Sequence, residues 1–170
     1  LKWLNTKTGK KVVNKTRRKI RKQELDSVKP IKHFLKLTQP IVNEYVRLRD
    51  IDKPCISCGK YDHELKATTR GKWDAGHYKT VGARSELRFN TKNINKQCVR
   101  CNGYQGGDIS GQKTGIVKRF GQARLDWLDG HHESKDYSIE DLAKMRRVFN
   151  KKIRMVERRR AAAIAAINGG

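Results

Sequence analysis

The sequence lacks any apolar run long enough to cross a bilayer, and no charged-apolar-small signal segment stands at its start. It also lacks a strongly basic helix with an aromatic opposite face, which is the pattern of helices that lie on anionic membranes. These absences argue against a membrane as the partner. We therefore expect a soluble protein located in the cytoplasm.

Acidic residues are scarce relative to basic ones. The 170 residues include 40 Lys and Arg but only 17 Asp and Glu, so the formal net charge is +23 and the pI is about 10.2. A chain with this excess repels itself unless it binds a polyanion. DNA or RNA is therefore the expected partner, and no small-molecule substrate is expected.

Only four cysteines are present, and they form two CxxC pairs with 39 residues between them: Cys55 with Cys58, and Cys98 with Cys101. A CxxC turn presents two thiolates to one ion, and two such turns complete a closed tetrahedral zinc site. In a reducing cytoplasm, cysteines in this spacing are more often metal ligands than disulfides. We therefore predict a structural Zn²⁺ bound by all four cysteines.

Hydrophobic periodicity predicts an α+β chain, with two short strands near residues 73–80 and 93–98 and helices on either side. Before the first cysteine, the pattern predicts two helices, the second of which begins at Thr38. The expected organisation has four parts: a flexible basic arm (1–26), N-terminal helices (27–52), a core that contains the cysteines (53–112) and a C-terminal helical region (113–170).

The two ends of the chain have distinct compositions. The first 23 residues contain ten Lys or Arg and no acid, which indicates either an arm that neutralises phosphates or a solvated tail. Near the other end, an apolar stripe from Leu142 to Val156 predicts a long amphipathic helix whose apolar face is either core or a dimer seam. If it is a seam, the protein is a homodimer. We expect residues 157–170 to fray.

Three polar residues lie between the cysteine pairs or directly after them: His77, Asn93 and Asn102. Histidine can act as a base near neutral pH, so His77 is predicted to activate a water molecule. A hard cation such as Mg²⁺ prefers oxygen ligands, which Asp74 and Asn102 can supply. Asn93 is then left to hold the loop and orient the imidazole. Together these groups meet the requirements for phosphodiester hydrolysis.

Basic residues close to the predicted site are candidates for contacts with the nucleic-acid backbone: Lys79, Arg84, Arg88 and Lys96. Each is also consistent with a solvated charge. Because phosphate contacts carry no sequence information, selectivity would have to come from the shape of the DNA. No helix-turn-helix pattern that would read the major groove is evident.

A set of residues at fixed spacing resembles the HNH nucleases of the ββα-metal superfamily: Asp74-x-x-His77, Asn93-Ile94 and Cys98-x-x-Cys101-Asn102, with a CxxC upstream. The resemblance implies a zinc-stapled ββα-metal core flanked by N- and C-terminal helices. It also implies that His77 is the general base, that Asn93 positions it and that Asn102 binds the catalytic metal. Two positions depart from the family pattern, because Asn102 replaces His and Gly76 stands where the family often has Asp or His.

Longer strings resemble the NinG/Rap family of lambdoid phages, which are recombination endonucleases that act on branched DNA: Cys55-Ile-Ser-Cys-Gly, Trp73-Asp-Ala-Gly-His-Tyr, Leu87-Arg-Phe-Asn and Asn95-Lys-Gln-Cys. The similarity covers roughly residues 38–150 and does not extend clearly to the first 25. It implies a Mg²⁺- or Mn²⁺-dependent endonuclease that cleaves D-loops and Holliday junctions. Composition and spacing alone do not indicate that selectivity.

Other functions stay open on the residues alone. A noncatalytic zinc module that only binds nucleic acid would use the same cysteines and charge, but it gives no reason for the spacing of His77, Asn93 and Asn102. A sequence-specific HNH endonuclease would share the site but usually needs a groove-reading element. A basic structural protein of an RNA assembly would bind without metal-dependent cutting.

Overall fold

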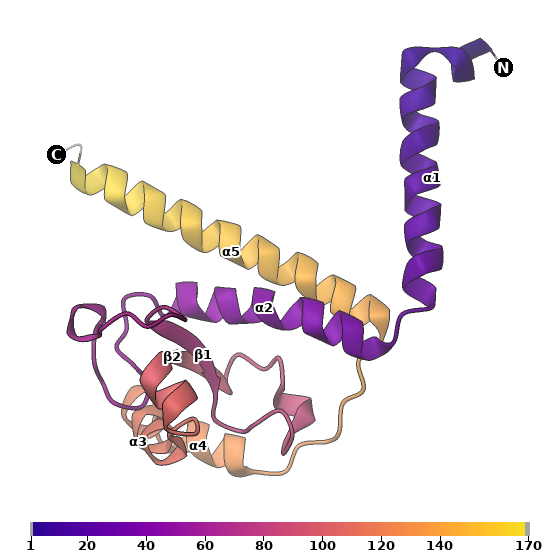
Figure 1. The fold of residues 1–170 in the computed structure, drawn as a ribbon. Helices are drawn as coiled ribbons and strands as arrows, with labels where there is room; N and C mark the ends of the chain where they lie inside the picture. Colours follow the sequence, from indigo (N-terminus) through magenta and orange to yellow (C-terminus); the bar gives the residue numbers. More distant parts are fainter. Residues whose placement is uncertain (1, 169–170) are drawn as a thin grey trace.

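The computed structural model describes residues 2–168, without the side chains of residues 2, 4, 26 and 27. Helices and one two-stranded sheet make up the fold, which confirms the predicted α+β class. The elements are, in chain order, η1 (Lys2–Asn5), α1 (Lys7–Ser27), α2 (Ile31–Arg49), η2 (Asp62–Glu64), β1 (Trp73–His77), η3 (Ser85–Leu87), β2 (Ile94–Cys98), η4 (Arg100–Tyr104), α3 (Ile109–Phe120), α4 (Gln122–Asp129) and α5 (Ile139–Asn168). Figure 1 shows them in layers, with α5 on α2, α2 on the sheet, and α3 and α4 on the far side of the sheet from α2.

The sheet is formed by β1 and β2, which pair antiparallel with Trp73 opposite Cys98 and His77 opposite Ile94. This pairing confirms the positions of the two predicted strands, although β1 ends at His77 rather than at Thr80. Successive side chains alternate between the two faces of a strand. Ala75 and Ile94 accordingly share one face and are buried in the same apolar cluster as the inner side of α2.

A second apolar cluster lies on the side of the sheet occupied by α3 and α4. Its buried members come from the loops around the sheet and from the two helices: Ile56, Tyr78, Leu87, Ile116, Leu125 and Leu128. Gly121 separates the two helices, and its φ of 85° is a conformation that glycine adopts without steric cost. The sheet is therefore supported from both faces.

Helix α2 is a single helix, where the sequence pattern predicted two helices meeting at Thr38. Pro40 lies inside it and cannot donate the backbone hydrogen bond of its turn. The helix continues because one face is buried on both sides of the proline, at Phe34, Thr38, Val42 and Val46. The Thr38 hydroxyl also donates to the Phe34 carbonyl at 2.8 Å, which satisfies that polar group within the core.

Helix α5 begins at a reciprocal cap, because Asp141 N–H donates to the Ser138 hydroxyl at 3.0 Å and Ser138 N–H donates to the Asp141 carboxylate at 3.1 Å. Its apolar stripe packs on α2, with Phe149 against Tyr45 at 5.3 Å between ring centres. The stripe is therefore core within one chain. Residues 157–168 continue the helix instead of fraying, since their Ala-rich composition has high helix propensity; residues 169–170 lie outside the described part.

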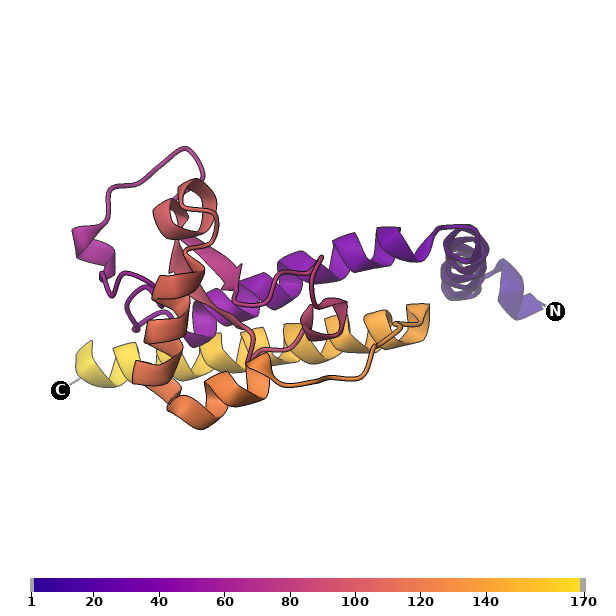
Figure 2. The ribbon, with the colours of Figure 1, turned by 90° about the horizontal axis from the view of Figure 1, so that it is seen from below.

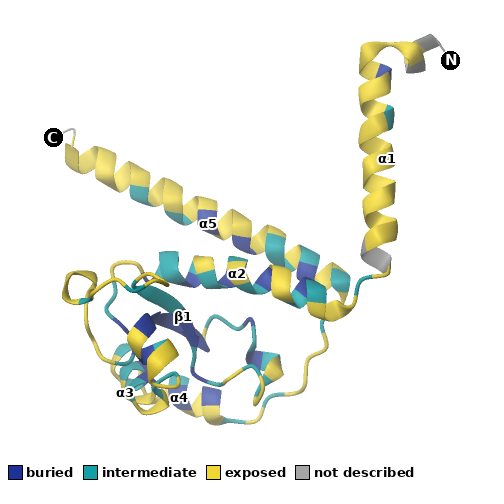
Figure 3. Cartoon of the chain, in the orientation of Figure 1, coloured by how far each residue is buried: buried dark blue, intermediate teal, exposed yellow. Residues whose placement is uncertain are grey.

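Helix α1 extends away from the layers (Figures 1 and 2), and among the described elements it contacts only η1. Figure 3 shows that nearly all of its described surface is exposed. Residues 1–26 were expected to form a flexible arm, whereas residues 7–27 form a helix. Their Lys, Arg and Gln are good helix formers, and this propensity outweighs the single Gly9. No helix within residues 2–168 is both long and apolar enough to cross a membrane.

Candidate active site

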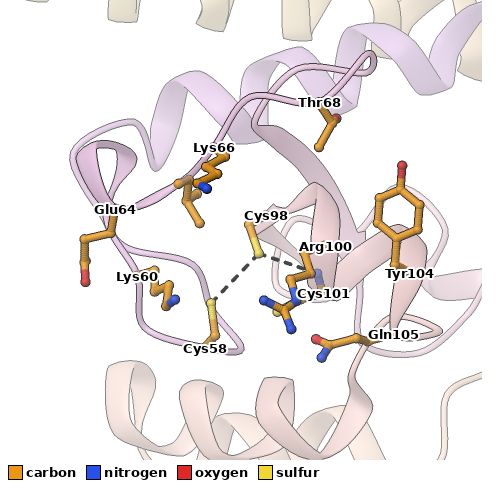
Figure 4. A pocket seen from close by; sticks show the side chains of 11 residues that line it. Cys58, Lys60, Glu64, Lys66, Thr68, Cys98, Arg100, Cys101, Tyr104 and Gln105 are labelled. Atoms are coloured by element: carbon orange, nitrogen blue, oxygen red, sulfur yellow. Dashed lines mark hydrogen bonds between the residues drawn. The ribbon is translucent and has the colours of Figure 1, made fainter.

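The four cysteines converge between the 55–59 turn and the end of β2. Their sulfur atoms all lie within 4.8 Å of one another, and the Cys58 and Cys98 sulfurs are 3.9 Å apart (Figure 4). In a tetrahedral site with Zn–S bonds of about 2.3 Å, the sulfurs are about 3.8 Å apart. The arrangement therefore fits one zinc ion, and the four residues predicted as its ligands are brought together.

Backbone N–H groups donate to two of the cysteine sulfurs. Cys98 N–H donates to the Cys55 sulfur at 3.3 Å, and Cys101 N–H donates to the Cys98 sulfur at 3.5 Å. Burial, followed by hydrogen bonds and charges of the neighbouring thiols, raises the pKa of the Cys101 thiol. A bound dication would reverse this effect, because thiolates are the form that coordinates zinc.

Asn93 is fully buried and holds the loop that follows β1. Its Oδ1 accepts the Lys79 N–H at 2.7 Å, while its Nδ2 donates to the Lys79 carbonyl at 2.9 Å and to the Leu87 carbonyl at 3.3 Å. The side chain thus closes both ends of the 79–87 segment. These contacts fit the predicted role of Asn93 in holding the loop. Its hydrogen bonds go to the backbone and not to the imidazole, so it orients His77 only through the loop.

His77 is the last residue of β1, and its ring is oriented by a backbone carbonyl. Nε2 lies 2.9 Å from the Arg88 oxygen, which can only accept a hydrogen bond, so Nε2 carries the proton in the neutral ring. Nδ1 is then the nitrogen with the lone pair. Burial lowers the pKa of His77, partly opposed by the Arg88 hydrogen bond. The imidazole is consequently neutral near pH 7, as a general base must be.

Asp74 and Asn102 meet where β1 lies against η4. Asn102 Nδ2 donates to Asp74 Oδ2 at 2.9 Å, and the Arg70 guanidinium lies 3.1 Å from the same oxygen. An amide and a carboxylate are therefore adjacent, as predicted, and the carboxylate already faces a cation. This donor set suits a divalent ion that retains several waters.

Strand alternation separates these groups into two sets. Asp74 and Gly76 share the face toward η4, whereas His77 shares the face of Ala75 toward α2. The structure therefore does not place His77 beside the Asp74–Asn102 pair on one face. The structure also accounts for a glycine at position 76. A Cβ there would overlap the side chain of buried Gln97, so the acid common at this position in HNH nucleases has no room.

Lys96 differs from its predicted role as a backbone-gripping residue. Its side chain is 3% exposed, Nζ donates to the Ile51 carbonyl at 2.7 Å, and it lies 4.0 Å from the centre of the Trp73 ring. Burial also lowers its pKa. Strand alternation directs the Lys96 side chain to the face of β2 that packs on α2. Lys96 therefore binds the backbone just after α2 instead of facing solvent.

The other three predicted basic residues are partly exposed and have partners within the chain. Lys79 pairs with Asp129 at 2.6 Å, and Arg84 pairs with Glu86 at 2.7 Å. Arg88 donates from Nε to the Gln39 side chain at 3.0 Å. These contacts hold the 79–92 loop against α2 and α4, so a phosphate would have to compete for them.

Sequence reasoning missed Arg70 and the cationic rim of a cavity beside the cysteines. The cavity has a volume of about 660 Å³, and Lys60, Lys66 and Arg100 line it together with the exposed Tyr104 (Figure 4). Arg70 was not among the basic residues predicted to contact the nucleic-acid backbone. Its position four residues before Asp74 was the available signal, but this spacing predicts a contact only in a helix.

Comparisons with known proteins agree on one family. The family model described as "Bacteriophage Lambda NinG protein" matches residues 2–159. The chain is 37% identical over 145 residues to Protein ninG of Escherichia phage lambda, covering 85% of this chain and 66% of that protein. It is 35% identical over 145 residues to Protein ninG of Salmonella phage P22, with coverage of 85% and 66%. The corresponding protein of Escherichia phage 933W is 35% identical over 149 residues, with coverage of 88% and 69%.

These relatives are longer than the chain, which spans about two thirds of their length. No solved structure matches it. The family match, in contrast, extends over nearly all of the described residues, including the cysteines and the polar groups on β1, β2 and η4. The chain therefore belongs to the NinG family of bacteriophage lambda.

Proposed function

We propose that the chain is an HNH-type, metal-dependent endonuclease that hydrolyses phosphodiester bonds in branched recombination intermediates, such as Holliday junctions and D-loops. The observation that carries the proposal is the placement of polar groups on the two faces of β1. A neutral His77 lies on one face, and the Asp74–Asn102 pair lies on the other.

Opposite faces suit the chemistry of phosphoryl transfer. In an in-line displacement, the attacking water and the departing oxygen lie on opposite sides of the phosphorus. The proposed phosphate position lies between His77 at the end of β1 and the Asp74–Asn102 pair near its start. Gly76 lies between them, and the side chain of Gln97 packs directly over it.

His77 would take a proton from water onto Nδ1 while the water oxygen forms a bond to phosphorus. The bond from phosphorus to the 3′ oxygen breaks, and that oxygen receives a proton from solvent, which leaves a 5′-phosphate and a 3′-hydroxyl. The Arg88 carbonyl keeps the imidazole in the tautomer that accepts at Nδ1. Asn93 holds the loop that carries this carbonyl.

Asp74 and Asn102 would hold a Mg²⁺ or Mn²⁺ ion through one carboxylate and one amide oxygen. When bound, the ion would neutralise charge on the phosphate and on the departing oxygen. The four cysteines would hold a structural zinc ion that joins the 55–58 turn to the end of β2. The net charge of +23 supports DNA as the partner, and the similarity to the NinG/Rap family supports branched DNA.

Cleavage of a labelled four-way junction tests the proposal, beside linear duplex and single strand of the same sequence, in Mg²⁺, Mn²⁺ or chelator. We expect metal-dependent cutting of the junction that His77→Ala abolishes while binding persists. His131→Ala, which removes an exposed histidine from a distant loop, should cut like the wild type.

Three other outcomes are informative. Binding without cutting in any metal would leave a noncatalytic zinc protein that binds nucleic acid. Equal cutting of all three substrates would keep the chemistry and remove the preference for branches. Cutting that depends on base sequence rather than on branching would favour a sequence-specific HNH endonuclease.

A further inference from the structure

Arg70 lies in a tight turn directly before β1. Thr68 and Gly71 close the turn with two backbone hydrogen bonds of 3.1 and 2.9 Å, and Gly71 has a φ of 87°. The Arg70 side chain is 55% exposed, whereas the side chain of its partner Asp74 is 19% exposed. A solvent-exposed cation is thus held at the entrance to a largely buried carboxylate.

The guanidinium occupies the position that a metal ion would use. Its Nη2 lies 3.1 Å from Asp74 Oδ2, the same oxygen that accepts from Asn102 at 2.9 Å. The group also lies along η4, because a Cβ at Gly103 would come within 2.9 Å of Arg70 Nη1. Arg70 therefore fills the junction of β1 and η4 with positive charge.

We infer that Arg70 is a phosphate-binding catalytic residue that occupies the cation position on Asp74 in the free protein and moves to the scissile phosphate when a divalent ion binds. This inference rests on the proposed nuclease function. It assigns to one side chain two roles with opposite effects, competition with the metal before DNA binds and stabilisation of the phosphate afterwards.

The exchange follows from charge and geometry. A divalent ion on Asp74 Oδ2 would repel a guanidinium at hydrogen-bond distance from the same oxygen, so the two cannot share it. The exposed side chain can swing outward at little loss of packing. An incoming phosphate then offers a new anion, and the planar guanidinium can bind two of its oxygens at once.

The test measures Mn²⁺ binding without DNA and single-turnover cleavage of the junction at saturating Mn²⁺, both on the zinc-loaded full chain. Arg70→Ala should bind Mn²⁺ about 2- to 5-fold more tightly, as expected for loss of an exposed ion pair. The same variant should cleave about 100-fold more slowly, as expected for loss of one charge-stabilising donor. Arg70→Lys should cleave at an intermediate rate, because lysine keeps the charge but cannot donate two parallel hydrogen bonds to the phosphate.

Two further variants make the result specific. Asp74→Asn removes the carboxylate of this site, so the Mn²⁺ binding that remains in this variant measures binding elsewhere on the chain. Lys72→Ala removes a cation from the same loop whose partner is Asp62 at 2.8 Å, not Asp74, and it should change neither quantity. Far-UV circular dichroism and zinc content establish that each variant is folded.

The outcomes separate the inference from the function on which it rests. If the wild type cuts and Arg70→Ala cuts equally well, or binds Mn²⁺ no more tightly, the role of Arg70 is overturned and the nuclease stands. A fall in both Mn²⁺ affinity and cleavage would mean that Arg70 only positions Asp74, and would also overturn it. If the wild type cuts no DNA in any metal, both proposals fail together.

Discussion

Removing the side chain of Asn93 should loosen the loop after β1 and lower the stability of the whole core. Asn93→Ala deletes three hydrogen bonds, two to the backbone of Lys79 and one to the Leu87 carbonyl. At about 1 kcal/mol for each neutral bond, the free energy of unfolding should fall by about 3 kcal/mol. That is a large fraction of the roughly 5–15 kcal/mol that stabilises a typical domain.

Urea unfolding of the zinc-loaded protein, followed by tryptophan fluorescence, measures the global effect. Hydrogen exchange at the Lys79 amide measures the local effect, since this N–H donates to Asn93 Oδ1, and its exchange should accelerate by about 100-fold. Asn43→Ala is the matched control, because this half-buried asparagine accepts a single bond from Gln39 and should cost less than about 1 kcal/mol.

A loss of stability below about 1 kcal/mol in Asn93→Ala, with Lys79 still protected, would refute the reasoning, because the loop would then hold itself. Since the same loop carries the Arg88 carbonyl on His77, we also expect slower cleavage by the folded variant. That effect should appear in the rate at saturating DNA rather than in binding.

Three further predictions follow from the site. Burial lowers the pKa of His77, so the unfolded chain binds a proton at this histidine more readily than the folded protein does. The free energy of unfolding should therefore decline as the pH falls below about 6.5. In urea melts at a series of pH values, His77→Gln should show a weaker decline over this range. Lys96→Ala should lower the free energy of unfolding by about 2 kcal/mol, yet leave the salt dependence of DNA binding unchanged in a fluorescence titration, since a buried lysine contacts no phosphate. Mass spectrometry of the native protein should find one zinc per chain, and Cys101→Ser should lose the zinc together with the near-ultraviolet dichroism of the core; a folded variant without zinc would contradict the structural role.

The sequence predicted the parts of the site that depend on local spacing. The two CxxC pairs identified four cysteines that lie close enough to bind one zinc ion, because the turn of each pair determines the geometry of its two thiols. Period-two alternation and the cysteines also located β1 and β2. The pairing of Asp74 with Asn102 came from the preference of a hard cation for oxygen ligands, not from periodicity.

Other features depended on tertiary contacts that no local pattern encodes. The burial of Lys96 follows from the pairing register and from the end of α2, which lies 45 residues away in the chain. The continuity of α2 through Pro40 reflects packing that outweighs a missing hydrogen bond. The helix at 7–27 was missed because charge was weighed more heavily than intrinsic propensity.

The zinc site also bears on the entropy of the unfolded chain. The 39 residues between the two CxxC pairs contain β1 and the whole 79–92 loop. A cross-link that closes a loop of this length removes about 4 kcal/mol of conformational freedom from the unfolded state, on the scale known for disulfides. A two-stranded sheet is marginal without such support. His77, Asp74 and Asn93 all lie within the loop that a zinc ion on the four cysteines would close, and Asn102 directly follows it. One such ion would limit how far all four residues can separate even when the rest of the chain opens.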